Sequence, residues 1–185
     1  TVSNGTGNQT SAPAVLIVGT KNIWHVKANA TGSNNGSSWA NAFTTLNSAL
    51  TAAANGDEIW VASGTYKPSS SGNRDAYFSI SKVLTILGGF AGNEVVASAR
   101  NWNSNIAILS GDFSGNDTGP GGNQGENSKR VLVYEGSGNA VLDGFRITGG
   151  NAPGFGQPDA GGGVYVGEGR TASIRNCIFY WNYAI

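Results

Sequence analysis

The sequence has few of the residue types on which many protein functions depend. It contains one cysteine, Cys177, so no disulfide can form within the chain. It contains one histidine, His25, and a single histidine cannot by itself build a histidine-based metal site or a Ser–His–Asp triad. No apolar run approaches the roughly 20 residues that a membrane helix needs. There is no methionine, even at position 1, and we therefore expect a processed or trimmed chain.

Charged residues are also scarce, at 12% of the 185 residues, and the 11 basic and 11 acidic side chains give a net charge of zero. Proteins that bind nucleic acid normally carry a basic excess or a basic stripe, so this balance argues against a nucleic-acid partner. With 39% apolar residues the chain can still bury a core. Its length fits one domain.

Glycine, in contrast, is abundant, with 29 residues, and asparagine is frequent throughout the chain. Both residues enter the left-handed backbone region easily, so the chain is expected to turn often. Frequent turns, few charges and many β-branched and aromatic residues favour an all-β protein made of short strands.

One helix is expected, over residues 42–54, because Phe43, Leu46 and Leu50 recur at helical spacing. No second helical pattern follows, which argues against a βαβ fold. Residues 1–22 are expected to form a flexible lead-in with an extra strand, AVLIVGT, at 14–20. Strands are expected at 23–28, 58–62, 76–80, 83–90, 106–113, 131–135, 140–150, 163–166 and 172–182.

The last third of the chain contains a repeat with an offset of 32 residues. Leu142 aligns with Ile174, and Phe145 aligns with Cys177. Each copy reads as strand, bend, strand, which is typical of a solenoid whose coils stack on one another. The alignment predicts an inward position for Cys177 and an exposed ion pair between Asp143 and Arg175.

The resulting fold prediction is a parallel β-helix over residues 23–185, capped by the helix at 42–54. The last coil motif runs up to Ile185 without a polar capping element. An open edge of this kind is an aggregation hazard. We therefore expect the β-helix to be truncated at its C-terminal end, with further coils or another subunit covering that edge.

Several segments resemble a known family. IWHVKANATGSNNGSSWANAFTTLNSAL (23–50), NGDEIWVASGTYKP (55–68) and LDGFRITGGNA (142–152) resemble secreted right-handed parallel β-helix proteins of Bacteroidota, described as polymorphic-outer-membrane-protein-like or as sorting-anchor β-helix proteins. GGGV (161–164) and FYWN (179–182) resemble the GGA-I and F-x-x-N repeats of chlamydial polymorphic outer membrane proteins. The resemblance implies an all-β, right-handed parallel β-helix that is secreted or lies on the cell surface, in a family without an established reaction.

The loop GDFSGNDTG (111–119) holds a candidate calcium site. Asp112, Asn116 and Asp117 offer oxygen ligands in a glycine-rich loop. The spacing differs from that of a recognised calcium loop, so an ordinary turn stabilised by its Asp and Asn side chains is the simpler interpretation. No other cofactor is indicated.

Exposed aromatic residues are the candidate ligand-binding residues. Trp102 and Tyr180 are expected on the outside of the protein, where they can stack on sugar rings. Trp39 and Trp60 are instead expected to pack between the helix and the first coil.

Catalytic candidates are scattered along the chain. A lyase or glycoside hydrolase needs clustered carboxylates and a base. The candidates are Asp112, Asp117, Asp143 and Asp159 as acids and Arg146, Arg175 and Lys129 as bases, and no pair repeats on adjacent coils. His25 and Cys177 are expected to be structural.

These observations favour a non-catalytic, secreted or cell-surface protein with a structural and adhesive role, whose loops bind polysaccharide or another cell surface. Two alternatives remain open. One is a carbohydrate-active enzyme, either a polysaccharide lyase or a glycoside hydrolase. The other is a self-assembling extracellular filament or matrix subunit.

Overall fold

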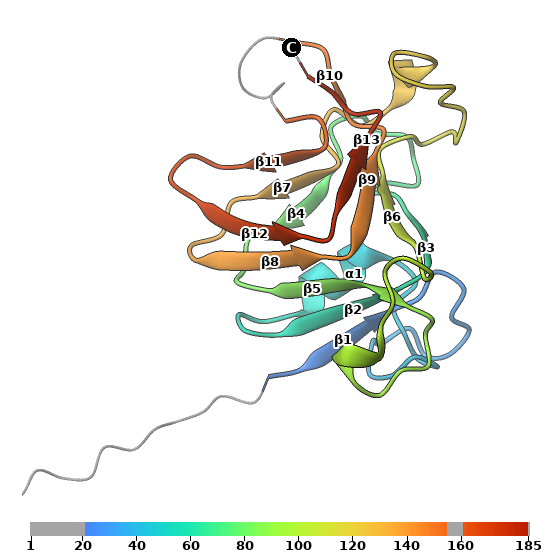
Figure 1. Ribbon diagram of the computed structural model, residues 1–185, viewed down its shortest axis with the longest axis vertical. Coiled ribbons are helices and arrows are strands. Elements are labelled where there is room, and N and C mark those ends of the chain that lie inside the picture. The colour runs from blue at the N-terminus through green and yellow to red at the C-terminus, as the bar shows by residue number, and fades with distance from the viewer. Residues whose placement is uncertain (1–20, 155–160, 185) are drawn as a thin grey trace, which may run out of the picture.

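The computed structural model describes residues 21–154 and 161–184 (Figure 1). The sequence predictions for the strand at 14–20 and for Asp159 concern positions outside these residues. The described chain forms fourteen short strands, one α-helix and two 3₁₀ helices, η1 (Ala97–Ala99) and η2 (Gln124–Glu126).

The strands form four sheets, in which every strand pair is parallel. The first sheet contains, in spatial order, β1 (Ile23–Val26), β2 (Glu58–Ala62), β5 (Thr85–Phe90), β8 (Asn139–Asp143) and β12 (Thr171–Arg175). The second contains β3 (Gly64–Tyr66), β6 (Ala107–Ser110), β9 (Phe145–Thr148) and β13 (Ile178–Tyr180). The third contains β4 (Phe78–Ile80), β7 (Leu132–Tyr134) and β11 (Val164–Val166), and the fourth contains β10 (Asn151–Ala152) and β14 (Tyr183–Ala184).

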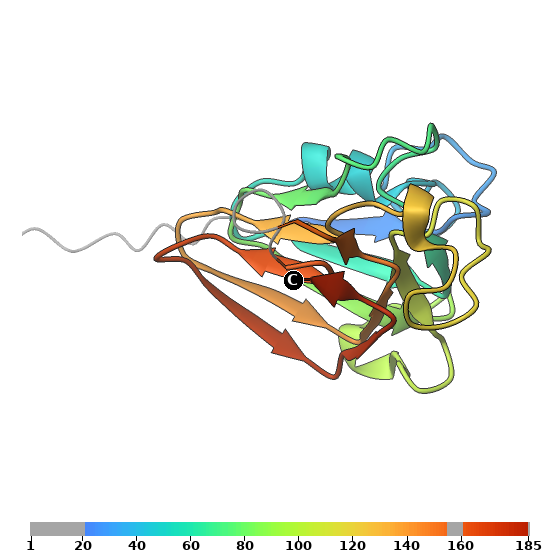
Figure 2. The same ribbon diagram turned by 90° about the horizontal axis from the view of Figure 1, so that it is seen from above.

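The chain visits these sheets in a fixed order. From β2 it passes to β3 and β4, from β5 to β6 and β7, and from β8 to β9 and, after β10, to β11, so each of these three passes places one strand in each of the first three sheets. Figure 1 shows successive passes following one another from β1 to β12, and Figure 2 shows the same strands from above. Residues that occupy equivalent positions in neighbouring passes therefore lie side by side.

The helix α1 (Leu46–Ala52) lies between β1 and β2 in the chain. Thr45 caps its N-terminus by accepting a hydrogen bond from the backbone amide of Ser48, and Leu46, Ala49 and Leu50 are buried. At the other end, Lys82 Nζ donates to the carbonyl oxygens of Leu50, Thr51 and Ala53 at 2.6–3.0 Å. A cation at this position also complements the helix dipole.

The fold-class prediction, an all-β right-handed parallel β-helix with an N-terminal capping helix, is contradicted. Four separate parallel sheets are present, and within the described chain none is closed on itself. Moreover, α1 belongs to the crossover between the parallel strands β1 and β2, which makes this part of the chain a βαβ unit and the architecture α/β-like. The sequence argument against βαβ units failed because one helix between two parallel strands is enough to form one.

The 32-residue repeat is confirmed by the strand register. Leu142 pairs with Ile174 and Asp143 with Arg175, and the strands bend at Gly144, whose φ is +86°. The predicted ion pair of Asp143 with Arg175 is wrong. Asp143 instead pairs with Arg100, whose Nη2 lies 3.0 Å from Asp143 Oδ1, and both side chains are nearly buried.

The main core lies between the first three sheets and α1. Its largest fully buried side chains include Phe78, Phe145 and Tyr134, and Cys177 packs partly buried against it. The sequence placed Trp39 and Trp60 between the helix and the first coil, and this is wrong. Trp60 belongs to a second cluster with Leu87 and Phe90, and Trp39 packs against that cluster and not against α1. Alternation along β2 turns Trp60 away from its buried neighbours Ile59 and Val61, which lie in the main core.

Candidate binding groove

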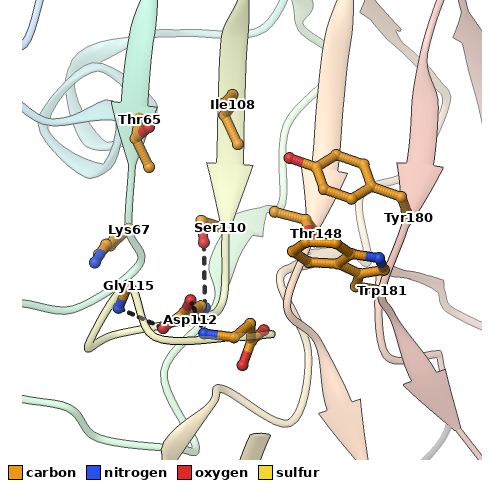
Figure 3. A pocket seen from close by; sticks show the side chains of 10 residues that line it. Thr65, Lys67, Ile108, Ser110, Asp112, Gly115, Thr148, Tyr180 and Trp181 are labelled. Carbon is orange, nitrogen blue, oxygen red and sulfur yellow. Dashed lines mark hydrogen bonds between the residues drawn. The ribbon is translucent and has the colours of Figure 1, made fainter. Parts of the chain in front are cut away.

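An open groove of about 400 Å³ with polar and aromatic walls lies along the second sheet (Figure 3). It is bordered by β3, β6, β9, the end of β13 and the loop that follows β6. Its lining residues are Thr65, Lys67, Ile108, Ser110, Asp112, Gly115, Asp117, Thr148, Tyr180 and Trp181.

Strand register brings the floor of the groove together. Ser110 pairs with Thr148, and Thr148 pairs with Tyr180, so these three side chains form a row across the strands. Thr65 and Ile108 form a second, shorter row. Neighbouring parallel strands lie about 4.8 Å apart, so each row offers a regular series of contacts to an extended ligand.

Asp112 organises the loop at one side of the groove. Its carboxylate accepts hydrogen bonds from the backbone amides of Gly115, Asn116 and Asp117, at 2.5, 3.3 and 3.1 Å. Burial alone would raise the pKa of this carboxyl, but these amides, together with the charge of Lys67, outweigh it and hold the pKa below its ordinary value. Asp112 is therefore an ionised group whose oxygens already hold the loop in place.

Asp117 lies in a different environment. Its Oδ2 accepts a hydrogen bond of 2.9 Å from Asn127 Nδ2, whereas its Oδ1 is buried and has no partner. Burial raises the pKa of Asp117, and the negative charges of Asp112 and Glu126 raise it further, against the hydrogen bond from Asn127. The groove thus contains two carboxyl groups whose pKa values are shifted in opposite directions.

Tyr180 and Trp181 form the aromatic side of the groove (Figure 3). Their rings are 5.5 Å apart at 70°, and Trp181 is 40% exposed. Trp181 has a φ of +52°, an uncommon conformation for a large side chain. Neighbouring contacts hold this turn, because Asn182 donates to the carbonyls of Ile147 and Tyr180, and Gln124 Nε2 donates to the Trp181 carbonyl at 2.9 Å.

The structure separates the two predicted ligand-binding aromatics. Tyr180 lines the groove, whereas Trp102 borders a different, much smaller hollow, where the Arg100 guanidinium lies 4.9 Å from its ring. Of the predicted calcium ligands, Asp112 and Asp117 face the groove, and the carbonyl oxygen of Asn116 accepts a hydrogen bond from Asn123. The contributions of Lys67, Ser110 and Thr148 were missed, because only the pairing of strands far apart in the sequence reveals them.

His25 and Cys177 have structural surroundings. His25 lies 4.7 Å from the ring of Trp39 and 5.7 Å from that of Trp60, and its burial lowers its pKa. Burial likewise raises the pKa of the Cys177 thiol, whose Sγ lies 3.1 Å from the carbonyl oxygen of Arg175. Both surroundings disfavour the charged forms of these side chains.

Within residues 21–154 and 161–184, no three or more His, Cys, Asp or Glu side chains are grouped so that they could hold a metal ion. In the same part of the chain, no helix has the length and apolar character required to cross a membrane.

In comparisons with known proteins, no protein-family profile, no curated protein and no solved structure matches this chain. The functional argument therefore depends on the groove itself.

Proposed function

We propose that the protein is a non-catalytic, adhesive protein outside the cell or on its surface, and that the groove binds polysaccharide. The observation that carries the proposal is the aromatic pair Tyr180 and Trp181 beside a row of hydroxyl and carboxylate groups in one open groove. Sugar rings present apolar C–H faces that stack on aromatic rings, and their hydroxyls hydrogen-bond to side chains such as Ser110 and Thr148.

The open shape of the groove supports a polymer ligand. The two rows of side chains run across successive strands, so a chain of sugars lying along a row meets similar groups at regular intervals. Lys67 lies near Asp112 at one side, with its Nζ donating to the carbonyl of Phe113 at 2.9 Å. With one lysine and two carboxyl groups, the wall of the groove has no excess of positive charge, which favours hydroxyl-rich ligands over strongly anionic ones.

The state of the carboxyl groups supports binding without turnover. Glycoside hydrolysis uses two carboxyl groups, one as acid and one as nucleophile or base. Asp112 has the lowered pKa that the second role requires, but both of its oxygens accept backbone hydrogen bonds within its own loop. Asp117 therefore lacks a free carboxylate partner in the groove.

The extracellular location is supported by sequence motifs. GGGV (161–164) and FYWN (179–182) resemble repeats of surface proteins, and the low content of charge and cysteine is compatible with such proteins.

Glycan-array screening of the 185-residue protein, followed by calorimetry with the best polysaccharide, tests the proposal. Trp181→Ala and Tyr180→Ala are each expected to weaken binding by roughly 5- to 150-fold, from the loss of about 1–3 kcal/mol of stacking and burial. Trp102→Ala is the matched control, because Trp102 is a comparably exposed tryptophan outside the groove. Release of reducing or unsaturated sugars from the bound polysaccharide would favour the enzyme alternative instead.

One observation favours self-assembly as a second candidate function. The last pass exposes large apolar side chains, including Ile178 at 54% and Phe179 at 46%. At the opposite end, β1 is covered by the chain itself, since His25 and Lys27 amides donate to the carbonyls of Gly36 and Phe43. Among the described residues, β1 is thus covered by the chain itself, whereas the exposed apolar side chains of β13 could accept another copy, with the β-prone segment at 14–20 as a candidate for the contact.

Light scattering over a concentration series tests this candidate. Assembly predicts a rise in mass that is lost in Ile178→Lys and after deletion of residues 1–20. A protein that stays monomeric at all concentrations would eliminate it.

A further inference from the structure

The loop between β6 and β7 contains a group of buried oxygen atoms that no protein group satisfies. Asp117 Oδ1, Glu126 Oε1 and Asn127 Oδ1 are all buried and have no hydrogen-bond partner. Asn127 is fully buried, at 0% exposure. Buried acceptors in folded proteins almost always have a donor, so three orphaned oxygens within eleven residues of one loop require an explanation.

These three side chains are close together. The Asn127 amide is directed at the Asp117 carboxylate, with 2.9 Å between Nδ2 and Oδ2. Glu126 is the last residue of η2 and directly precedes Asn127, and its charge acts on the Asp117 carboxylate. Asp117 and Asn127 are therefore in direct contact, and Glu126 lies next to them in the same loop.

The charges of this group are not balanced by the protein. The ion pairs formed among residues 21–154 and 161–184 join Lys21 to Glu58, Arg100 to Asp143 and Lys129 to Asp75, so neither Asp117 nor Glu126 takes part. Two like charges brought together with partial burial lower stability unless a cation lies between them.

We propose that Asp117, Glu126 and Asn127 bind a divalent cation of the calcium type. All three donors are oxygens, two of them charged, and Ca²⁺ accepts carboxylate, amide, backbone carbonyl and water oxygens in an adaptable geometry. Zinc, which favours nitrogen and sulfur ligands, has none here. With only two carboxylates, the group differs from a centre built of three acidic or histidine ligands, and water or backbone oxygens complete the coordination.

This donor set differs from the one that the sequence suggested. Asp112 is not among the proposed ligands, because its two oxygens already accept hydrogen bonds from three backbone amides and thereby shape the loop. Glu126 and Asn127 take its place, although they lie nine or more residues further along the chain than Asp117. The cation would also fix Asp117 at the wall of the groove, but its binding is measurable without any glycan.

Calcium chloride titrated into the metal-free 185-residue protein, followed by calorimetry and by thermal unfolding, tests the proposal. Binding at one site is expected, and Ca²⁺ at about a hundred times its Kd raises the Tm by roughly 5–10 °C. Glu126→Gln is expected to weaken binding at least tenfold and to remove most of the rise. Because Glu126 Oε1 has no partner to lose, the metal-free variant should be no less stable than the original protein.

Glu168→Gln is the matched control, because it removes one carboxylate from an exposed turn far along the chain from the loop. It is expected to bind Ca²⁺ like the original protein. The proposal is overturned if no heat and no Tm rise occur up to about 10 mM Ca²⁺, which exceeds the weakest Kd of extracellular calcium modules. It is equally overturned if Glu126→Gln binds as tightly as the control.

Discussion

Replacing Asp57 by asparagine is expected to lower the free energy of unfolding by about 2–3 kcal/mol at pH 7. Asp57 is 2% exposed and has no cationic partner among the described ion pairs. Its carboxylate accepts hydrogen bonds of 2.9 Å each from the backbone amides of Asn22 and Ala54 and from the indole of Trp24. These bonds join β1 to the end of α1, so the substitution acts on the βαβ unit.

The magnitude follows from the geometry of the amide. Oδ2 receives Trp24 and Ala54, and Oδ1 receives Asn22, so an asparagine must turn its NH₂ group toward at least one N–H donor. One hydrogen bond to a charged acceptor is worth about 1.5–3 kcal/mol, and the remaining bonds weaken when the charge is lost. For a chain of this size the expected fall in Tm is about 4–12 °C.

The effect should depend on pH in a defined direction. Burial alone would raise the pKa of Asp57, but the hydrogen bonds from Ala54, Trp24 and Asn22 outweigh it and hold the pKa below the ordinary value of 3.8. A carboxyl with a lowered folded-state pKa contributes stability above the unfolded-state pKa and loses it as the pH falls through the folded-state pKa. The difference between the two proteins should therefore be full at pH 7 and shrink below pH 3.8.

Urea denaturation at several pH values, followed by circular dichroism, measures both effects. Asp75→Asn is the control, since Asp75 is 73% exposed and its ion pair with Lys129 should contribute no more than about 1 kcal/mol. Surface substitutions usually change the free energy of unfolding by no more than about 0.5 kcal/mol. The reasoning is refuted if the free energy of unfolding of Asp57→Asn at pH 7 lies within about that margin of the value for the original protein.

Three further outcomes are expected. Phe145→Ala should lower the free energy of unfolding, measured by urea denaturation, by about 3–5 kcal/mol, because Phe145 is 2% exposed. Phe179 is 46% exposed, so Phe179→Ala should lower it by no more than about 1 kcal/mol, and equal losses would contradict the core assignment. Gly144→Ala should lower it by about 1–3 kcal/mol, because φ is +86° there and a Cβ would lie 2.7 Å from Arg100 Nη1; an unchanged Tm would argue against the bend. Burial raises the pKa of Cys177, so iodoacetamide should label it at pH 8 more slowly than it labels a free thiol. The labelling rate should rise when urea unfolds the protein, whereas rapid labelling of the folded protein would show an exposed thiolate.

Local pattern was enough to locate most elements. The β-prone run EIWVA predicted β2 at 58–62, and the spacing of Leu46 and Leu50 predicted the helix, although it begins at Leu46 and not at residue 42. The repeat predicted the pairing of Leu142 with Ile174, because parallel stacking in register places similar residues side by side. Short β3 was missed since Ser63 and Gly64 read as a turn.

Contacts between residues far apart in the sequence could not be predicted from local sequence pattern. Composition pointed to an all-β chain, but the position of the helix within the β1–β2 crossover depends on which strands pair, and β1 pairs with β2 across 35 residues. The same holds for Asp143, whose partner Arg100 comes from another pass of the chain and not from the neighbouring repeat. In the groove, Tyr180 could be proposed from its predicted outward-facing position on the strand, whereas Ser110 and Thr148 join it only through strand register.

The coverage of β1 by its own neighbouring residues also has a consequence for the order in which the protein can fold. The β1 end is closed by contacts within residues 23–43, so it can be completed before any later strand exists. Each subsequent strand of the first sheet then adds to an edge that is already formed. If the chain folds as it is synthesised, the strands of the first sheet can therefore pair one after another from β1 onward, before the later residues have been synthesised. Substitutions in β1 should impair every later step, and those in β12 only the addition of β12 and of the strands that follow it.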